Sequence, residues 1–207
     1  MKIKAILFDM DGVLIDAKDW HYEALNKSLG LFGYDISRYE HLLSYDGLPT
    51  KVKLERLTLE KGLPKYLHSF INEMKQQYTM NIVQNYCRPK FNHEYALSKL
   101  KANNYKLGLC SNSIKKTVDI MMKMSFLYEY FDIKLNNEDV INPKPDPEIY
   151  NKAISMLKLY PEECLVLEDN ENGINAAKAS GAHILIVKSV NDVNYINIMN
   201  RINEIEG

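Results

Sequence analysis

The chain lacks the features that mark membrane, secreted and nucleic-acid-binding proteins. It has no apolar run long enough to span a bilayer, and acids appear too early for an N-terminal signal peptide. Its 26 Lys and Arg residues balance 27 Asp and Glu residues without a basic stripe or an acidic tail. This balance argues against a nucleic acid or a membrane surface as partner. We expect a small molecule to be the partner instead.

Cysteine is also scarce, and its spacing excludes a common kind of metal site. The three cysteines, Cys87, Cys110 and Cys164, are an odd number without metal-ligand spacing. Cys110 and Cys164 adjoin apolar runs, which predicts buried thiols in a reducing compartment. We therefore expect a cytoplasmic protein, either a monomer or a weak homodimer.

What the chain does have is an alternation of strand and helix patterns. Hydrophobic residues make up 46% of it, enough for a substantial core. Short apolar runs predict strands at 3–8, 105–110, 131–135, 164–167 and 184–187. Helical patterns separate these runs after residue 92. Such alternation predicts an α/β fold with a doubly wound parallel sheet and right-handed crossovers.

Between the first two strands the pattern is only helical. We expect an all-helical cap over residues 16–87, inserted into a core formed by 1–15 and 88–207. Asp19 is a candidate cap of the first helix, and Gly62 a candidate end of a later one. Apolar residues at i, i+3, i+4, i+7 and i+11 predict the last cap helix. These residues are Leu67, Phe70, Ile71, Met74 and Tyr78.

Two carboxylates follow the first expected strand. Asp9 and Asp11 stand two residues apart, directly before Gly12. A chain that leaves its sheet at a glycine can turn both side chains into the crevice beyond the strand end, where open α/β sheets bind ligands. One carboxylate can then act as a nucleophile while the other moves protons. The alternative is a plain polar turn, because Asp-Gly is a common turn sequence.

Further polar residues follow two other expected strands. Ser111, Asn112 and Ser113 offer donors for a phosphoryl oxygen, and Glu168 and Asp169 form a second acidic pair. In a parallel sheet all the carboxyl ends lie on one edge, so these side chains should converge with the first acidic pair. That many carboxylates would repel one another without a cation, and Mg²⁺ fits such oxygen ligands.

A lysine flanked by prolines precedes one of the expected helices. Pro143 and Pro145 hold the backbone at Lys144 extended and prevent it from joining a helix. A lysine in such a loop is usually just a surface charge. Here the loop leads into a helix at the strand ends, which favours an inward-facing side chain.

Taken in order, these segments resemble the four motifs of the haloacid-dehalogenase superfamily. The resemblance covers essentially the whole chain and is to the subgroup with a helical cap, which includes β-phosphoglucomutase-like phosphatases. The matching runs are Phe8-Asp9-Met10-Asp11-Gly12-Val13-Leu14, Ser111-Asn112, Lys144-Pro145-Asp146-Pro147 and Glu168-Asp169-Asn170-Glu171-Asn172-Gly173-Ile174.

The resemblance implies a Mg²⁺-dependent phosphatase that hydrolyses a small phosphorylated metabolite, such as a sugar phosphate. Asp9 would form an aspartyl-phosphate, and Asp11 would be the general acid and base. Ser111, Asn112 and Lys144 would neutralise the phosphoryl oxygens. The implied metal ligands are Asp9, Asp11 through its backbone carbonyl, Glu168 and Asp169.

Two alternatives stand beside the phosphatase. One is a sugar-phosphate mutase of the β-phosphoglucomutase type, and the other is a binding module that kept the fold. Related mutases hold the distal phosphate with a cap arginine, where this chain has Thr50 followed by Lys51. This favours hydrolysis, with Thr50, Lys51 and His21 as candidate substrate contacts. For His21 the alternative is an ordinary polar position on a helix.

Overall fold

The computed structural model of the chain describes residues 2–207 and divides into two compact units. One unit runs to Asp16 and resumes over Arg88–Gly207, and the other is Ala17–Cys87. The second unit is therefore an insertion into the first. Among residues 2–207, no helix is both long enough and apolar enough to cross a membrane.

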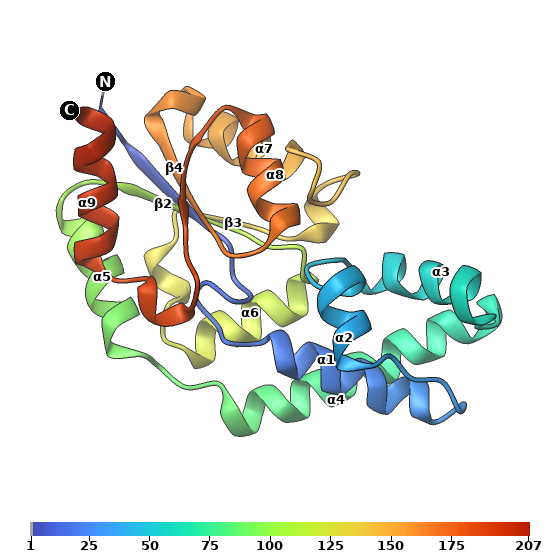
Figure 1. Cartoon of the computed structure of the whole chain (residues 1–207). Coiled ribbons are helices and arrows are strands. Elements are labelled where there is room, and N and C mark those ends of the chain that lie inside the picture. The colour runs from blue at the N-terminus through green and yellow to red at the C-terminus, as the bar shows by residue number, and fades with distance from the viewer. Residues whose placement is uncertain (1) are drawn as a thin grey trace. The chain divides into compact units, whose positions relative to one another are not determined.

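The first unit is built on a five-stranded sheet in which every pairing is parallel. The strands are β1 (Ala5–Phe8), β2 (Lys106–Cys110), β3 (Ile133–Leu135), β4 (Cys164–Glu168) and β5 (His183–Ile186). Their order is β3-β2-β1-β4-β5, so the first strand of the chain is the central one (Figure 1). The predicted doubly wound parallel sheet is confirmed.

Helices cover both faces of this sheet (Figure 1). They are α5 (Phe91–Ala102), α6 (Lys115–Met124), α7 (Glu148–Leu157), α8 (Glu171–Ser180) and α9 (Tyr195–Glu206). Helices α5 and α9 pack together, as do α7 and α8 on the other face. Short helical turns join them: η3 (Tyr128–Tyr130), η4 (Asn137–Asp139), η5 (Pro161–Glu163) and η6 (Val190–Asp192).

The burial of β1 explains its composition and sets the position of the site. All four of its residues are buried, because it lies between two strands and between two helical layers. Phe8 pairs with Leu109 of β2 and Leu167 of β4. The next residue in each strand therefore lies level with the others at the carboxyl edge of the sheet. These residues are Asp9, Cys110 and Glu168.

The predicted strand boundaries differ from the observed ones by one or two residues. The strand predicted at 131–135 begins at Ile133, because the Asp132 side chain binds the backbone of β2. Its Oδ2 accepts a hydrogen bond from Leu107 N (2.7 Å), and its own backbone N–H donates to Leu107 O (2.8 Å). A carboxylate thus closes the end of the β2–β3 ladder.

The second unit, Ala17–Cys87, is helical throughout its regular structure. Its elements are α1 (Lys18–Gly30), α2 (Arg38–Glu40), the π-helix η1 (His41–Tyr45), α3 (Thr50–Lys61), η2 (Lys65–Leu67) and α4 (His68–Tyr86). Its own apolar core contains Leu25, Leu29, Ile36, Tyr45, Leu54, Leu57, Leu63 and Ile71. We call this segment the helical unit.

The last cap helix is present as predicted, but Asp19 is not the N-cap of the first one, and the buried face of the last helix differs from the apolar stripe. Helix α1 begins one residue before Asp19, so Ala17 is the N-cap and the Asp19 carboxylate instead accepts a hydrogen bond from Arg38. In α4, Phe70 is 48% exposed. The buried positions in α4 are Ile71, Lys75, Thr79 and Val83. Tertiary contacts, which periodicity does not reveal, select a different face of the helix.

Candidate active site

The side chain of Lys144 joins the carboxyl ends of three neighbouring strands. Its Nζ donates to Asp9 Oδ1 (2.6 Å), to the backbone oxygen of Cys110 (2.8 Å) and to Glu168 Oε1 (2.6 Å). The Lys144 side chain is only 3% exposed, so these bonds form away from water. An ammonium group has three protons, and each one has an acceptor here.

The turn after β1 aims Asp9 and Asp11 away from the strand. The Asp9 backbone N–H still donates to Leu167 O (3.1 Å), which extends the pairing with β4 by one residue. The chain then reverses at Gly12, whose φ of 89° lies in the left-handed region that favours glycine. Gly12 N donates to Ile15 O (2.7 Å), which closes the turn.

Asn112 fixes the backbone on which Lys144 stands. Asn112 Nδ2 donates to Lys144 O (3.3 Å), and Lys144 N donates to Asn112 Oδ1 (3.1 Å). Both ends of the amide therefore bind the Lys144 backbone. The amide holds the lysine loop in this structure, and its contact with a phosphoryl oxygen stays a prediction.

The two serines beside Asn112 have different environments. Ser111 is fully buried, and its Oγ accepts a hydrogen bond from Ser113 N (3.0 Å), which leaves its hydroxyl proton to donate. Ser113 Oγ donates to Asp11 Oδ2 (2.8 Å). Ser113 thus orients the carboxylate that the sequence predicts to be the general acid and base.

The electrostatics of the site favour an additional cation. Burial, the largest effect, raises the pKa of the Asp9 carboxyl well above its usual value. Lys144 opposes this rise, while Glu168, Asp169 and Asp11 add to it. Four carboxyl groups therefore act against one ammonium. A bound cation would counter this rise and favour the ionised form of Asp9.

Lys144 itself stays charged in this environment. Burial alone would lower the pKa of its ammonium, but the carboxylates of Asp9 and Glu168 outweigh burial and raise that pKa above its usual value. The ion pairs are buried, so breaking one would leave an uncompensated charge and cost several kcal/mol, about 3–5. Lys144 is therefore a permanent cation of the site.

Three of the predicted metal ligands lie close together. Asp9, Glu168 and Asp169 each place one carboxylate oxygen so that the three oxygens lie within 4.8 Å of one another. Hard oxygen donors at this separation suit a small divalent cation. The donor set of this site therefore fits Mg²⁺.

The predicted substrate contacts His21, Thr50 and Lys51 all lie in the helical unit. His21 Nδ1 lies 3.2 Å from Lys75 Nζ, and Thr50 is the first residue of α3. Lys51 is exposed, whereas Lys53 on the same helix is only 7% exposed. Sequence reasoning did not single out Lys53.

Sequence reasoning also missed two residues of the first unit. Tyr150 Oη donates to Glu168 Oε1 (2.6 Å) from within α7. The available signal was a tyrosine on the apolar face of a helix, since a buried hydroxyl needs a partner. Gly173 lies so close to Glu168 that a Cβ there would overlap the carboxylate. Gly173 lies within the fourth motif run, but that match assigned it no role.

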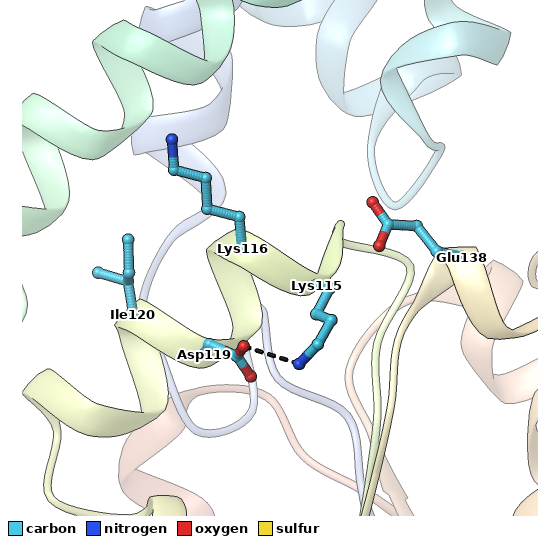
Figure 2. A pocket seen from close by; sticks show the side chains of 5 residues that line it. All are labelled: Lys115, Lys116, Asp119, Ile120 and Glu138. Atoms are coloured by element: carbon cyan, nitrogen blue, oxygen red, sulfur yellow. Dashed lines mark hydrogen bonds and ion pairs between the residues drawn. The ribbon is translucent and has the colours of Figure 1, made fainter.

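A separate hollow of about 470 Å³ lies at the start of α6. Figure 2 shows its lining side chains, with Lys115 paired to Asp119 (2.8 Å). Lys116, Ile120 and Glu138 complete the lining. Two cations thus face two anions there. The carboxylates around Lys144 take no part in this lining, so the hollow is distinct from the charged site.

Comparisons with known proteins agree with this chemistry. The family model described as haloacid dehalogenase-like hydrolase matches residues 6–187. The phosphorylated carbohydrates phosphatase of Thermotoga maritima is 29% identical over 197 residues, which cover 92% of this chain and 88% of that protein. Pyrophosphatase PpaX of Bacillus cereus is 28% identical over 187 residues, which cover 87% of this chain and 81% of that protein.

A solved structure resembles the whole chain. The β-phosphoglucomutase of Clostridium difficile is 25% identical with a TM-score of 0.84, and the match covers 98% of both chains. The family model spans most of the sequence, from β1 to the residue after β5. The chain therefore belongs to the haloacid dehalogenase-like hydrolase family and is an enzyme of the phosphatase type.

Proposed function

We propose that the chain is a Mg²⁺-dependent phosphatase that hydrolyses a small phosphorylated metabolite, namely a sugar phosphate, through an aspartyl-phosphate on Asp9. The observation that carries this proposal is the contact of Lys144 Nζ with Asp9 Oδ1 at 2.6 Å, beside two further carboxylates. A fixed cation next to a buried carboxylate suits the charge that develops in phosphoryl transfer.

In the first step, a carboxylate oxygen of Asp9 attacks the phosphorus atom of the ester. The bond from this oxygen to phosphorus forms while the bond from phosphorus to the leaving oxygen breaks. Asp11 gives its proton to the leaving alkoxide. The hydrogen bond from Ser113 holds Asp11 in one orientation for this transfer.

In the second step, water hydrolyses the aspartyl-phosphate. Asp11, now a carboxylate, takes a proton from this water as the water attacks phosphorus. The bond from the Asp9 oxygen to phosphorus breaks, inorganic phosphate leaves, and both carboxyl groups return to their starting states. The same residue thus acts as acid and then as base, as balance of protons requires.

The donor groups of the site divide the remaining tasks. Asp9, Glu168, Asp169 and the Asp11 carbonyl are the ligands we propose for Mg²⁺, which supplies positive charge for the phosphoryl oxygens when bound. The Ser111 hydroxyl donates to those oxygens, and the Lys144 ammonium neutralises their charge from its place beside Asp9. Asn112 supports them by holding the Lys144 backbone.

Residues of the helical unit would select the substrate. We assign His21, Thr50 and Lys51 to substrate contacts, and the bond between His21 and Lys75 supports a polar role for His21. A sugar phosphate needs donors for its hydroxyl groups, and these side chains can supply them. Replacing each by alanine should raise KM more than it lowers kcat.

The direct test measures phosphate release from a panel of sugar phosphates and pyrophosphate, with Mg²⁺ and with EDTA. Pyrophosphate is included because one relative is named a pyrophosphatase. Acid quenching of the reaction with ³²P-labelled substrate should trap label on the protein, released by alkali as expected for an acyl phosphate. Absence of phosphate release across the panel, or release that EDTA does not affect, would overturn the proposal.

The second candidate is a sugar-phosphate mutase, favoured by the likeness to the Clostridium difficile β-phosphoglucomutase. A mutase must hold a bisphosphate at both ends, which suits a bidentate arginine better than a flexible lysine. The test incubates the enzyme with hexose 1-phosphates, a trace of bisphosphate and Mg²⁺. Conversion to the 6-phosphate without phosphate release would make mutase transfer the activity.

A further inference from the structure

The hydroxyl of Tyr150 lies in the centre of the first unit, directly behind the charged site. Tyr150 is fully buried in α7, and its Oη donates to Glu168 Oε1 at 2.6 Å. The same oxygen accepts a bond from Lys144 Nζ, also at 2.6 Å. The single proton of this hydroxyl therefore points at the Glu168 carboxylate.

Both carboxylate oxygens of Glu168 accept hydrogen bonds from neighbouring residues. Its Oε1 receives Lys144 and Tyr150, and its Oε2 accepts from the backbone N–H of Asp169 (3.2 Å). The first turn of α8 lies against the carboxylate at Gly173. A carboxylate oxygen offers about two lone-pair sites, so Oε1 is filled by these two donors.

The position of Glu168 in turn directs Lys144. Of the three acceptors of Lys144, the Cys110 carbonyl is fixed by the sheet, while Asp9 must change as it reacts. Glu168 is the remaining anchor. Lys144 Nζ also lies 4.9 Å from the centre of the Tyr150 ring, which adds a cation–π contact on one side. Tyr150 thus contacts both members of this pair.

We propose that Tyr150 is a positioning residue for phosphoryl transfer. Its hydroxyl fixes the rotation of the Glu168 carboxylate, and Glu168 then aims the Lys144 ammonium at Asp9 and at the transferred group. This inference rests on the proposed phosphatase mechanism. It adds a residue that acts through two others and touches neither the substrate nor the phosphoryl group.

The first experiment replaces Tyr150 by phenylalanine, which keeps the ring and removes only the hydroxyl. A charge-assisted hydrogen bond is lost, so we expect kcat to fall about tenfold, with KM changed less than twofold. Tyr160→Phe is the matched control, because Tyr160 is 74% exposed. A change confined to thermal stability, with kcat within twofold of the parent, would overturn the inference.

A double-mutant cycle tests whether the effect passes through Glu168. In a Glu168→Gln background, Tyr150→Phe should lower kcat less than twofold further, because the carboxylate that it orients is gone. If the two losses multiply instead, Tyr150 acts independently of Glu168 and the proposed route is wrong.

A third measurement does not depend on activity and so separates this inference from the proposed function. A buried ammonium exchanges its protons slowly enough to be seen by ¹⁵N NMR of lysine-labelled protein, and Lys144→Arg identifies its signal. We expect these protons to exchange at least about fivefold faster in Tyr150→Phe, because Glu168 loses the hydroxyl that fixes its rotation and its hydrogen bond to Lys144 then opens more often. An unchanged exchange rate would reject the positioning role even if the phosphatase assignment stands.

Discussion

Glu168 packs directly against Gly173, and no larger residue fits at position 173. A Cβ there would overlap both oxygens and the carboxyl carbon of Glu168. The end of a glutamate side chain normally moves away at little cost. Here Lys144 and Tyr150 hold it in place, so the backbone of α8 and the carboxylate of β4 depend on each other.

This contact predicts an unusual outcome for Gly173→Ala. Replacing glycine by alanine inside a helix normally stabilises a protein by about 0.5–1 kcal/mol. We expect the opposite here, a lower melting temperature together with a loss of phosphatase activity, because Glu168 must leave its position. Thermal unfolding and phosphate release measure the two effects.

The matched control is Gly30→Ala at the end of α1, where a Cβ would meet no atom within 4 Å. It should leave activity near that of the parent and leave stability unchanged or slightly higher. If Gly173→Ala behaves like this control, the tight packing of Glu168 is not required in solution.

The nucleophile assignment predicts a large effect of Asp9→Asn. The amide has the same shape but is a poor nucleophile, so turnover should fall on the order of 1,000-fold or more. The fold should persist, since β1 stays buried and paired. Phosphate release, circular dichroism and the acid-quench experiment would measure these outcomes, and Glu162→Gln on the exposed surface is the control. Activity within tenfold of the parent would rule out Asp9 as the nucleophile.

The charged residues of the site were predictable because they follow strands. A parallel sheet gathers the carboxyl ends of its strands on one edge, and this placed Asp9 and Glu168 together before any contact was known. The inward-facing side chain of Lys144 was predicted from the prolines on both sides of it and from the place of its loop before a helix at the strand ends. The role of Tyr150 was not predictable, because it becomes a neighbour of Glu168 only when α7 packs against the sheet. The contact of Gly173 with Glu168 depends on how α8 starts after β4, which the motif match did not show.

In the helical unit the sequence indicated helices but not their faces. Lys53 and Lys75 are buried, although the periodicity of apolar residues assigns polar positions to solvent. A burial pattern of this kind depends on contacts between elements distant in the chain. Lys51 was named instead from its place after Thr50, where related mutases carry an arginine, and it is exposed.

The proposed metal site predicts the behaviour of Asp169→Ala. Loss of one ligand among several should raise the Mg²⁺ concentration needed for half-maximal activity by about tenfold or more, and added Mg²⁺ should restore part of the activity. Titration of phosphate release with Mg²⁺ measures this shift. Glu204→Ala, which removes an exposed acid of α9, should leave the titration unchanged. Equal Mg²⁺ titrations for the Asp169 variant and the parent would contradict the ligand assignment.

The hydrogen bond from Ser113 to Asp11 predicts a smaller catalytic effect. Ser113→Ala removes a donor to a carboxylate, so kcat should fall about tenfold while KM changes little. Ser113→Thr keeps the hydroxyl and should recover most of the rate. Ser155→Ala on the exposed side of α7 is the control. An alanine variant as fast as the parent would show that Asp11 needs no support from Ser113.

His41 predicts how the stability of the protein depends on pH. Its side chain is 1% exposed, and its ring centre lies 5.0 Å from that of Tyr22. Burial first, and then the charge of Lys53, lowers the pKa of His41 from 6.5 to about 4. The unfolded chain therefore binds a proton more readily than the folded one between these two values. Stability should be complete above pH 6.5 and decline as the pH falls toward 4.

The variant that tests this is His41→Phe, which keeps an aromatic ring and removes the titration. Free energies of unfolding in urea would be compared with the parent at pH 7.5, 6.5, 5.5 and 4.5. The free energy of unfolding of the variant should rise relative to that of the parent as the pH falls, by about 2–3 kcal/mol at the lowest pH. Burial also lowers the pKa of His93, so this residue makes both proteins less stable at low pH. The test therefore compares the difference in unfolding free energy between the variant and the parent at each pH. Tyr22→Phe, which loses a hydroxyl but retains the ring beside His41, should keep the parent's pH dependence. Parallel curves for His41→Phe and the parent would show that His41 takes up its proton equally well in the folded and unfolded chain.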